Sequence, residues 1–182
     1  MLVPSTTPLI TEEEIAKRVD DLGAEIANSF CKMGPITVIG LLRGAFIFMA
    51  DLVRAISRHG GRVAELDFLI VSSYESSTES TGNIRIKQDV RFDIANKNVL
   101  IVDDILDTGL TLQRVSGLML DRKPVALKTV VLLDKPSRRE VNQEADYVGF
   151  KIENKFVVGY GLDFNHEYRD LPYVAVVEDD GK

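Results

Sequence analysis

The sequence is poor in the features that mark several large classes of protein. Only one cysteine, Cys31, occurs among its 182 residues, so no internal disulfide can form. No apolar run approaches the roughly 18 residues that a membrane-spanning helix needs, and residues 1–11 lack the basic-then-apolar pattern of a signal peptide. These absences argue against a disulfide scaffold and a helical membrane protein. We therefore expect a cytoplasmic protein with no membrane partner.

Positive charge is also scarce relative to negative charge. Against 28 Asp and Glu residues stand 22 Lys and Arg residues, which gives a net charge of −6. A protein whose main task is to grip a nucleic-acid backbone usually needs a basic face, so we expect no nucleic-acid partner. A phosphorylated small molecule stays compatible with this charge, because local groups and a metal ion can overcome a modest net charge.

Hydrophobic patterning predicts strands that alternate with helices, without internal repeats or low-complexity segments. Thr11 and Glu14 form a capping-box pattern, and apolar residues at helical spacing follow them, which predicts a helix over 12–32. We expect further helices over 44–59 and 111–121. Short apolar runs predict strands over 36–42, 66–72, 84–88, 98–102, 127–133, 147–152, 156–160 and 174–177.

This order of elements predicts a single α/β domain over residues 1–182, with an open, mostly parallel twisted sheet and helices on both faces. In such sheets ligands bind beyond the carboxyl ends of the strands, where the strand order switches. The loops after Leu42, Val102 and Leu133 should therefore share one rim. The polar segment 72–83 is expected to be a mobile loop, and long mobile loops are often lids.

The largest cluster of candidate functional side chains follows directly after the apolar run 99–102. The adjacent carboxylates of Asp103 and Asp104 are costly together unless a cation or hydroxyl donors meet them, and Mg²⁺ and sugar diols are natural partners. The turn Asp107-Thr108-Gly109-Leu110-Thr111 then offers backbone N–H groups and hydroxyls at a helix start, which suits a phosphate. These groups together predict a ribose 5-phosphate site. In the alternative interpretation, Asp104 and Asp107 only cap the helix.

The run 99–109, Val-Leu-Ile-Val-Asp-Asp-Ile-Leu-Asp-Thr-Gly, closely resembles the phosphoribosyl-pyrophosphate signature of the type I phosphoribosyltransferases. From about 36 to 177 the chain is similar to the purine-salvage branch of that family. The resemblance implies an enzyme that converts hypoxanthine, and also guanine, with phosphoribosyl pyrophosphate into IMP or GMP and pyrophosphate. It further implies Mg²⁺ as cofactor, a homodimer or homotetramer, a mobile loop at about 72–90, and a small hood built from the terminal segments, with elements at about 153–175.

The resemblance also implies roles for the residues that bind the phosphorylated substrate. Asp103 and Asp104 would hold the ribose hydroxyls and, with Asp163, lie close to the metal. The run Asp107, Thr108, Gly109, Leu110 and Thr111 would hold the 5-phosphate, with Asp107 also the general base at N7 of the purine. Pyrophosphate would be bound by Arg43, Gly44 and Arg169, with the Leu42–Arg43 peptide typically cis in this family.

The purine would meet a second group of residues. Lys135 corresponds to the lysine that donates to O6, Phe156 to the aromatic residue that stacks on the base, and Val157 to the residue whose backbone reads the base edge. Asp163 lies near the same edge. Ser73 and Tyr74 correspond to the flexible loop that closes over the reacting centre and would exclude water from a cationic sugar.

The sequence departs from the family pattern at a few positions. Asp103 stands where the first acid is commonly Glu, and Leu110 stands where many relatives have a polar or basic residue. The sequence of residues 134–139, Asp-Lys-Pro-Ser-Arg-Arg, also differs from the one common around the family's purine-binding lysine. His59 and His166 match no catalytic position.

Three other classes of protein share part of this pattern. A regulator on the same fold that switches on RNA or DNA would need a basic face. A phosphoacceptor receiver domain would draw its acids from different strands, whereas here they cluster ahead of Thr108-Gly109. An enzyme of the same family that prefers xanthine or guanine would differ from one that prefers hypoxanthine only in how backbone groups bind the 2-position of the base. The sequence leaves the preference among these three bases open.

Overall fold

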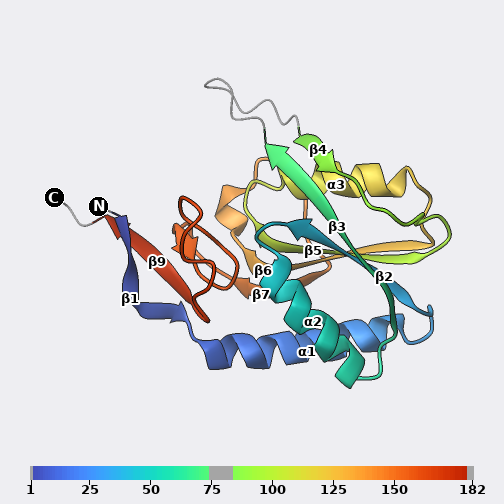
Figure 1. Cartoon of the computed structure of the whole chain (residues 1–182), viewed down its shortest axis with the longest axis horizontal. Coiled ribbons are helices and arrows are strands. Elements are labelled where there is room, and N and C mark those ends of the chain that lie inside the picture. The colour runs from blue at the N-terminus through green and yellow to red at the C-terminus, as the bar shows by residue number, and fades with distance from the viewer. Residues whose placement is uncertain (1, 74–83, 180–182) are drawn as a thin grey trace.

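The computed structural model describes residues 2–73 and 84–179, and its centre is a six-stranded sheet with the order β4-β3-β2-β5-β6-β7 (Figure 1). The strands are β2 (Ile36–Leu42), β3 (Val63–Ser73), β4 (Ile84–Gln88), β5 (Asn98–Leu106), β6 (Ala126–Asp134) and β7 (Tyr147–Lys151). All neighbours are parallel except β4, which runs antiparallel to β3. The predicted open, mostly parallel sheet is therefore confirmed.

Helices cover both faces of this sheet. On one face lie α1 (Glu12–Phe30) and α2 (Phe46–Arg58), and on the other lies α3 (Leu110–Leu120) (Figure 1). The predicted capping box starts α1, since the Glu14 N–H donates to the Thr11 hydroxyl and the Thr11 N–H donates to the Glu14 carboxylate. In the described part of the chain, no helix is long and apolar enough to cross a membrane.

Alternate residues of the central strands pack into two separate cores. Val38 and Leu100 point toward α1 and α2, whereas Ile39 and Ile101 point toward α3, and all four are fully buried. Strands buried on both faces need continuous apolar runs rather than an alternating pattern. This explains why these strands were predictable from short runs of Val, Ile and Leu.

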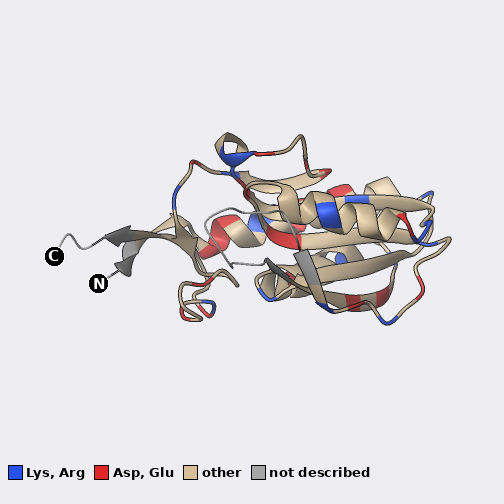
Figure 2. Cartoon of the chain, turned by 90° about the horizontal axis from the view of Figure 1, so that it is seen from above, with Lys and Arg blue, Asp and Glu red and all other residues tan. Residues whose placement is uncertain are grey.

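The two ends of the described chain build a second, smaller sheet. β1 (Leu2–Ile10) pairs antiparallel with β9 (Val174–Asp179), which in turn pairs with β8 (Val157–Val158). Seen from above, this sheet projects from one end of the layered body (Figure 2). It corresponds to the small hood of terminal segments that the family resemblance implied, and we call it the hood sheet.

Several predicted boundaries were wrong in an informative way. The strand expected over 98–102 continues to Leu106, so Asp103 and Asp104 lie within β5 and not in a loop. The strand expected over 156–160 is reduced to Val157–Val158, because Gly159, Tyr160 and Gly161 have φ of 99°, 50° and 103°. A left-handed backbone cannot continue a strand.

The order of the strands defines where a ligand should bind. Along the chain, β2 is followed by β3 on one side of the sheet, whereas β5 and β6 extend it on the other side. The order thus switches between β2 and β5, which are direct neighbours. Beyond their carboxyl ends lie the 43–45 loop and the 107–109 turn, at the position where open α/β sheets bind ligands.

Candidate active site

The acidic pair sits at the end of β5, and each carboxyl group accepts a hydrogen bond from the backbone N–H of the residue that follows it. Asp103 is buried, and its Oδ1 accepts the N–H of Asp104 at 3.0 Å. Asp104 Oδ1 accepts the N–H of Ile105 at 2.9 Å. Both carboxyl groups are thus held by the strand that carries them, with room left for further donors on their remaining oxygen atoms.

Burial disfavours negative charge on both acids. It raises the pKa of Asp103 well above the usual range, and the neighbouring Asp104 raises it further. Burial also raises the pKa of Asp104, although hydrogen bonds from its neighbours and the positive charge of Arg169 act in the opposite direction. A ligand that brings hydroxyl donors or positive charge would relieve this penalty.

The turn after β5 forms a hollow of about 220 Å³ between the acids and the start of α3, lined by the following residues: Asp103, Asp104, Ile105, Leu106, Asp107, Thr108, Gly109, Thr111 and Leu112. The N-cap of α3 is Gly109, with φ of 89° and no side-chain cap. The Thr108 hydroxyl accepts the N–H of Leu110 at 3.4 Å. Neither Asp104 nor Asp107 caps α3, so the alternative in which these acids serve the helix alone is wrong.

Two cations approach Asp107. Arg138 Nε lies 3.1 Å from one carboxylate oxygen of Asp107, and Lys135 Nζ lies 3.9 Å from the other. Lys135 is buried, which lowers its pKa, whereas the charge of Asp107 acts to raise it. The structure therefore brings the expected purine lysine beside the expected general base, although the two residues follow different strands.

The loop after β2 packs directly against the acidic pair. Its Leu42–Arg43 peptide is cis, and the Arg43 side chain is exposed. An ideal Cβ on Gly44 would lie 1.5 Å from Oδ2 of Asp104, so only a glycine fits there. Behind it, a Cβ on Gly161 would lie 2.2 Å from the carbonyl oxygen of Gly44.

Arg169 and Asp163 join this cluster from the segment before β9. Arg169 Nη2 lies 2.6 Å from Asp163 Oδ1, and Arg169 Nη1 donates to the carbonyl of Gly161 at 2.5 Å. Asp163 Oδ2 also accepts the N–H of His166 at 2.9 Å. The residues expected to bind pyrophosphate and metal therefore surround the 43–45 loop from two sides.

Two of the residues expected to bind the base, Phe156 and Val157, lie in or beside the hood sheet. Phe156 is 54% exposed and meets Phe164 edge to face, with ring centroids 5.6 Å apart. Val157 is buried in β8 and pairs with Val176 of β9. Because about half of Phe156 is exposed, its ring is accessible to a flat base, which stacks on aromatic faces.

Some expected residues stand apart from the cluster. Ser73 ends β3, whereas Tyr74 and most of the predicted mobile loop lie outside the described residues. His59 pairs with Asp20 at 2.9 Å between α2 and α1, and the His166 side chain is 85% exposed. His59 therefore lies apart from the acidic cluster, whereas His166 contacts Asp163 with its backbone N–H at 2.9 Å and its ring at 3.7 Å.

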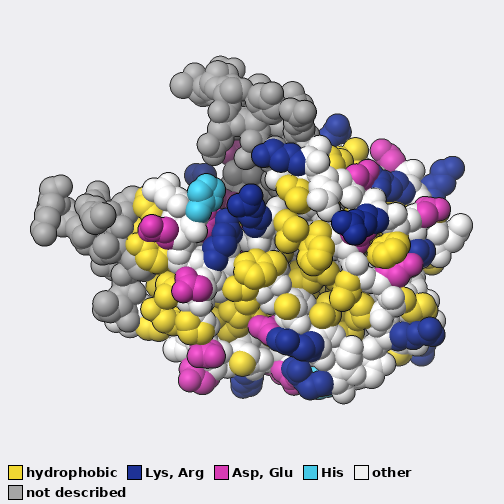
Figure 3. Space-filling view, in the orientation of Figure 1, with side chains coloured by type: hydrophobic (Ala, Val, Ile, Leu, Met, Phe, Trp, Pro, Cys, Tyr) yellow, Lys and Arg dark blue, Asp and Glu magenta, His cyan; other side chains and the backbone are white. Residues whose placement is uncertain are grey.

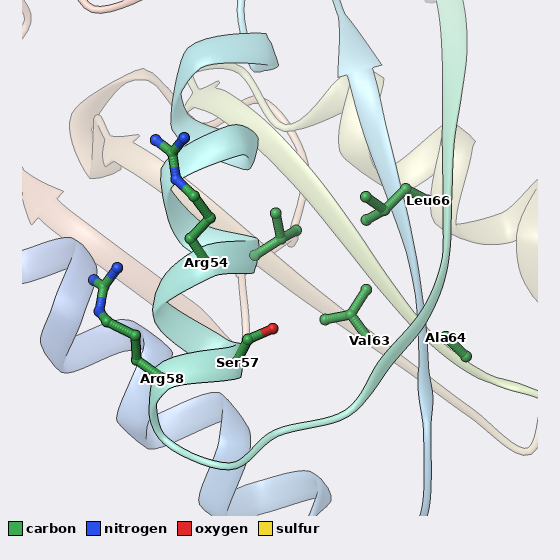
Figure 4. Close-up of a pocket in the computed structure, with 7 residues that line it drawn as sticks. Arg54, Ser57, Arg58, Val63, Ala64 and Leu66 are labelled. Carbon is green, nitrogen blue, oxygen red and sulfur yellow. The ribbon is translucent and has the colours of Figure 1, made fainter.

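A larger cavity lies away from this site. It measures about 830 Å³ and is bordered by residues of α2 and β3, among them Arg54, Arg58 and Leu66 (Figure 4). The same side of the molecule carries a broad apolar surface (Figure 3), and Phe46, Leu66 and Phe68 are 44%, 47% and 37% exposed. This cavity contains none of the expected site residues, so the larger of the two cavities is not the candidate active site.

Sequence reasoning missed three residues that hold the site together. Arg138 contacts Asp107, and Arg139 bonds the backbone of the 106–107 segment. The hydroxyl of Tyr160 donates to Asp51 Oδ2 at 2.5 Å and so ties the segment before Gly161 to α2. The sequence offered one indication, the two arginines directly after Lys135-Pro136-Ser137, of which at least one could be expected to bond to groups near Lys135.

The donor set suits a magnesium ion that arrives with a substrate. Among the described residues, no group of three or more His, Cys, Asp or Glu side chains forms a metal cage. Mg²⁺ commonly keeps waters and binds through one or two carboxylates plus substrate phosphates. Asp103 and Asp104, whose ionised forms are destabilised by burial, fit that mode.

Comparison with known proteins agrees with this geometry. The model of the phosphoribosyl transferase domain matches residues 7–165, which is most of the chain. The protein therefore belongs to the phosphoribosyl transferase family, as the signature run predicted.

Individual relatives narrow the class. The hypoxanthine-guanine phosphoribosyltransferase of Aquifex aeolicus is 50% identical over 171 residues, 94% of either chain. That of Bacillus subtilis is 45% identical over 170 residues, which cover 93% of this chain and 92% of the relative. A solved hypoxanthine phosphoribosyl transferase of Trypanosoma cruzi has a TM-score of 0.92 at 41% identity, covering 96% of this chain and 92% of that one. The chain thus falls among the hypoxanthine-guanine phosphoribosyltransferases.

Proposed function

We propose that the protein transfers the phosphoribosyl group of phosphoribosyl pyrophosphate to hypoxanthine, and also to guanine, and releases IMP or GMP and pyrophosphate. The observation that carries this proposal is the hollow of residues 103–112, in which an acidic pair and a helix-start turn line one space. Asp107 at its rim lies 3.9 Å from Lys135. Sugar, phosphate and base would thus find their partners within one cluster.

In the proposed reaction, the bond between C1 of ribose and pyrophosphate breaks and leaves oxocarbenium-like positive charge on the sugar. Asp103 and Asp104 would accept hydrogen bonds from the 2- and 3-hydroxyls, and their negative charge lies where positive charge develops. The backbone N–H groups and the threonine hydroxyls of Asp107, Thr108, Gly109, Leu110 and Thr111 would hold the 5-phosphate. Such fixed dipoles act without reorganisation at the moment of reaction.

At the base, Lys135 would donate to O6 and Asp107 would accept the proton of N7 as N9 attacks C1. Lys135 is suited to this role because its buried ammonium group has a hydrogen-bond donor to offer and few solvent contacts to lose. Phe156 would stack on the ring, and the backbone of Val157 and the region of Asp163 would read its edge. Adenine carries an amino donor at the 6-position, which opposes the Lys135 donor.

Pyrophosphate would be held by Arg43, by the backbone at Gly44 and by Arg169, whose planar fork of donors suits phosphate oxygens. Mg²⁺, held by Asp103, Asp104 or Asp163 together with the substrate, would supply positive charge to the leaving pyrophosphate. Ser73 and Tyr74 belong to the loop proposed to close over the site and exclude water.

A direct assay tests the proposal. Purified protein with Mg²⁺ and phosphoribosyl pyrophosphate is offered hypoxanthine, guanine, xanthine and adenine in turn, and nucleotide and pyrophosphate are measured. We expect turnover with hypoxanthine and guanine, and an Asp107→Ala variant that folds normally but loses about 10²–10⁴-fold in turnover, the usual range for general acid–base catalysis. Absence of turnover with every base, or near-wild-type turnover of Asp107→Ala, contradicts the proposal.

We also propose a homodimer or homotetramer of this chain in the cytoplasm. The exposed apolar side chains of Phe46, Leu66 and Phe68 beside the α2–β3 cavity support self-association, because large exposed apolar surfaces usually mark contact sites. The molar mass in solution, measured by light scattering, tests the assembly. A Leu66→Asp variant that keeps the wild-type mass would remove this surface from consideration.

A further inference from the structure

Arg139 lies behind the turn that follows β5 and uses its guanidinium group almost entirely on backbone carbonyls. Its Nη1 donates to the carbonyl of Leu106 at 2.8 Å, to the carbonyl of Asp107 and to the carbonyl of Lys135 at 3.3 Å. Its Nε donates to the carbonyl of Gln143 at 2.9 Å. One side chain thus joins the 106–107 segment to the 135–143 segment.

The next residue extends this pattern. The N–H of Glu140 donates to the carbonyl of Thr108 at 2.9 Å, and the N–H of Lys135 donates to the carbonyl of Leu106 at 3.0 Å. Three consecutive carbonyls, those of Leu106, Asp107 and Thr108, are therefore bonded from the 135–140 side. The 106–108 turn is therefore held through its carbonyl groups, and all of these bonds come from the side on which residues 135–140 lie.

This arrangement determines the direction of the N–H groups. In a trans peptide the N–H points away from the carbonyl of the preceding residue. Carbonyls of residues 106, 107 and 108 that face Arg139 and Glu140 therefore direct the N–H groups of Asp107, Thr108 and Gly109 to the opposite side. Consecutive N–H groups that point to one side form a concavity for anions.

The charge of Arg139 is itself compensated. Its Nη2 contacts Asp134 Oδ1, and Asp134 is buried at the end of β6. A Cβ placed on Gly109 would lie 3.0 Å from Val141 and 3.4 Å from the Arg139 side chain, so the turn packs closely on this support. Bonds to a carboxylate and four carbonyls occupy at least four of the five N–H donors of Arg139, so this side chain serves the turn.

We propose that Arg139 is a positioning residue for the 5-phosphate: it binds the carbonyl side of the 106–108 turn so that the N–H side faces the substrate. This inference rests on the proposed function. It assigns Arg139 no contact with phosphate, and it predicts an effect on the half of the substrate that the turn binds. The pyrophosphate half, bound by the 43–45 loop and Arg169 in the proposed function, is independent of the turn.

Arg18 offers a matched control within the same chain. It donates to the carbonyls of Gly149 and Val148 at 3.0 and 2.7 Å and pairs with Glu25 at 2.7 Å. It thus makes the same kinds of bond as Arg139, but it joins α1 to β7, away from the turn. Its loss should affect folding stability without changing substrate affinity.

The test compares Arg139→Met, Arg139→Lys and Arg18→Met. Ribose 5-phosphate and pyrophosphate are titrated separately by calorimetry, and the KM for phosphoribosyl pyrophosphate is measured with saturating hypoxanthine. For Arg139→Met we expect a dissociation constant for ribose 5-phosphate, and a KM, raised about 10–100-fold, as misplacement of a binding group by about 1 Å produces. Pyrophosphate affinity should change less than about twofold, since none of its proposed partners contacts Arg139.

Arg139→Lys keeps the charge beside Asp134 but offers fewer donors, so its ribose 5-phosphate affinity should fall between those of the wild type and Arg139→Met. If Arg139→Met does not fold, the affinities of Arg139→Lys for ribose 5-phosphate and pyrophosphate decide whether the inference holds. Equal losses for both ligands, or wild-type affinity for ribose 5-phosphate in the folded variant, overturn the inference. A wild-type protein that fails to turn over any purine overturns the proposed function instead, whatever the variants do.

Discussion

The carboxylate of Asp104 occupies the space that any side chain on residue 44 would need. A Cβ on Gly44 would lie 1.5 Å from Oδ2 of Asp104, far inside contact distance. The carbonyl of Gly44 is covered in turn by Gly161, whose own Cβ would lie 2.2 Å from that oxygen. Segments after β2, within β5 and before β9 therefore meet through two glycines and one acid, and the geometry of each depends on the others.

Gly44→Ala should displace Asp104 or the 43–45 loop and lower kcat/KM for phosphoribosyl pyrophosphate by about 10²-fold or more, since small displacements of reacting groups are costly. Steady-state kinetics with hypoxanthine measure this. Gly117→Ala is the control, because a Cβ there meets nothing within 4 Å and residue 117 lies inside α3. That change should leave the kinetics intact and stabilise the protein by about 0.5–1 kcal/mol. Wild-type kinetics for Gly44→Ala would contradict the packing described.

Asp103→Asn should raise the stability of the protein while weakening its binding of substrate. Burial raises the pKa of Asp103, so at neutral pH the folded protein must either bury a charge or take up a proton there, which lowers the free energy of unfolding, and a neutral amide removes that penalty. We expect a gain of about 1–3 kcal/mol and a Tm higher by about 2–4 °C per kcal/mol, with weaker binding of phosphoribosyl pyrophosphate. Thermal denaturation and substrate titration of the same samples measure both effects. An Asp103→Asn variant less stable than wild type at pH 7 would refute the expectation.

The pH dependence of that gain has a definite sign. A carboxyl group whose pKa is raised on folding binds more protons in the folded than in the unfolded state between the two pKa values. Wild-type stability therefore falls as pH rises from the usual Asp pKa, about 4, through the raised pKa of Asp103. Below about pH 4 the carboxyl is protonated in both states, so the stability difference between Asp103→Asn and wild type should vanish. Chemical denaturation of both proteins at pH 3.5, 5 and 7 checks this.

Lys135→Met should change base selectivity more than sugar binding. A hydrogen bond from a charged donor contributes about 1.5–3 kcal/mol, so kcat/KM for hypoxanthine should fall by about 10–10²-fold while that for adenine changes little. The KM for phosphoribosyl pyrophosphate should stay within about threefold of wild type. Competition assays with both bases give the ratio directly. Unchanged selectivity would remove Lys135 from the base site.

Tyr160→Phe should loosen the attachment of the segment before Gly161 to α2. Burial, together with the nearby Asp51, raises the pKa of Tyr160 above its usual range, so the hydroxyl stays a donor to Asp51 at all ordinary pH values. Its loss leaves Asp51 with Arg54 as partner and should cost about 1–2 kcal/mol of unfolding free energy. Denaturant titration measures this cost. Tyr147→Phe is a useful comparison, because Tyr147 lies in β7 at the far edge of the main sheet.

Sequence patterns of a few residues predicted those helices and strands that are determined by residues close together in the chain. The strands Ile36–Leu42 and Ile84–Gln88 and the start of α1 at Glu12 matched their predicted positions, because apolar runs, alternation and a capping box act within a few residues. β1 was missed because Pro4 and Pro8 argue against a strand. It forms as an edge strand whose register to β9 is interrupted between these prolines, which is where a sheet accepts proline.

The site residues were predictable where a motif carried them and not where tertiary contacts did. The signature run identified residues 103–111 as one unit, and the structure lines one hollow with nearly all of them. The bonds from Arg139 to the carbonyls of Leu106 and Asp107 span more than 30 residues, and the Tyr160–Asp51 bond spans 109. No spacing rule connects residues at such separations, so these contacts become visible only when the fold brings them together.

The pairing of β1 with β9 has a consequence for the order in which the protein is made. Residues 2–10 leave the ribosome long before their partner strand, residues 174–179, so β1 can pair only after β9 has been made. The main sheet, with the acidic pair and the turn after β5, needs nothing beyond β7 at residue 151. During synthesis, the acidic pair, the turn after β5 and Lys135 can therefore take up their positions before Phe156, Val157 and Arg169 have been made.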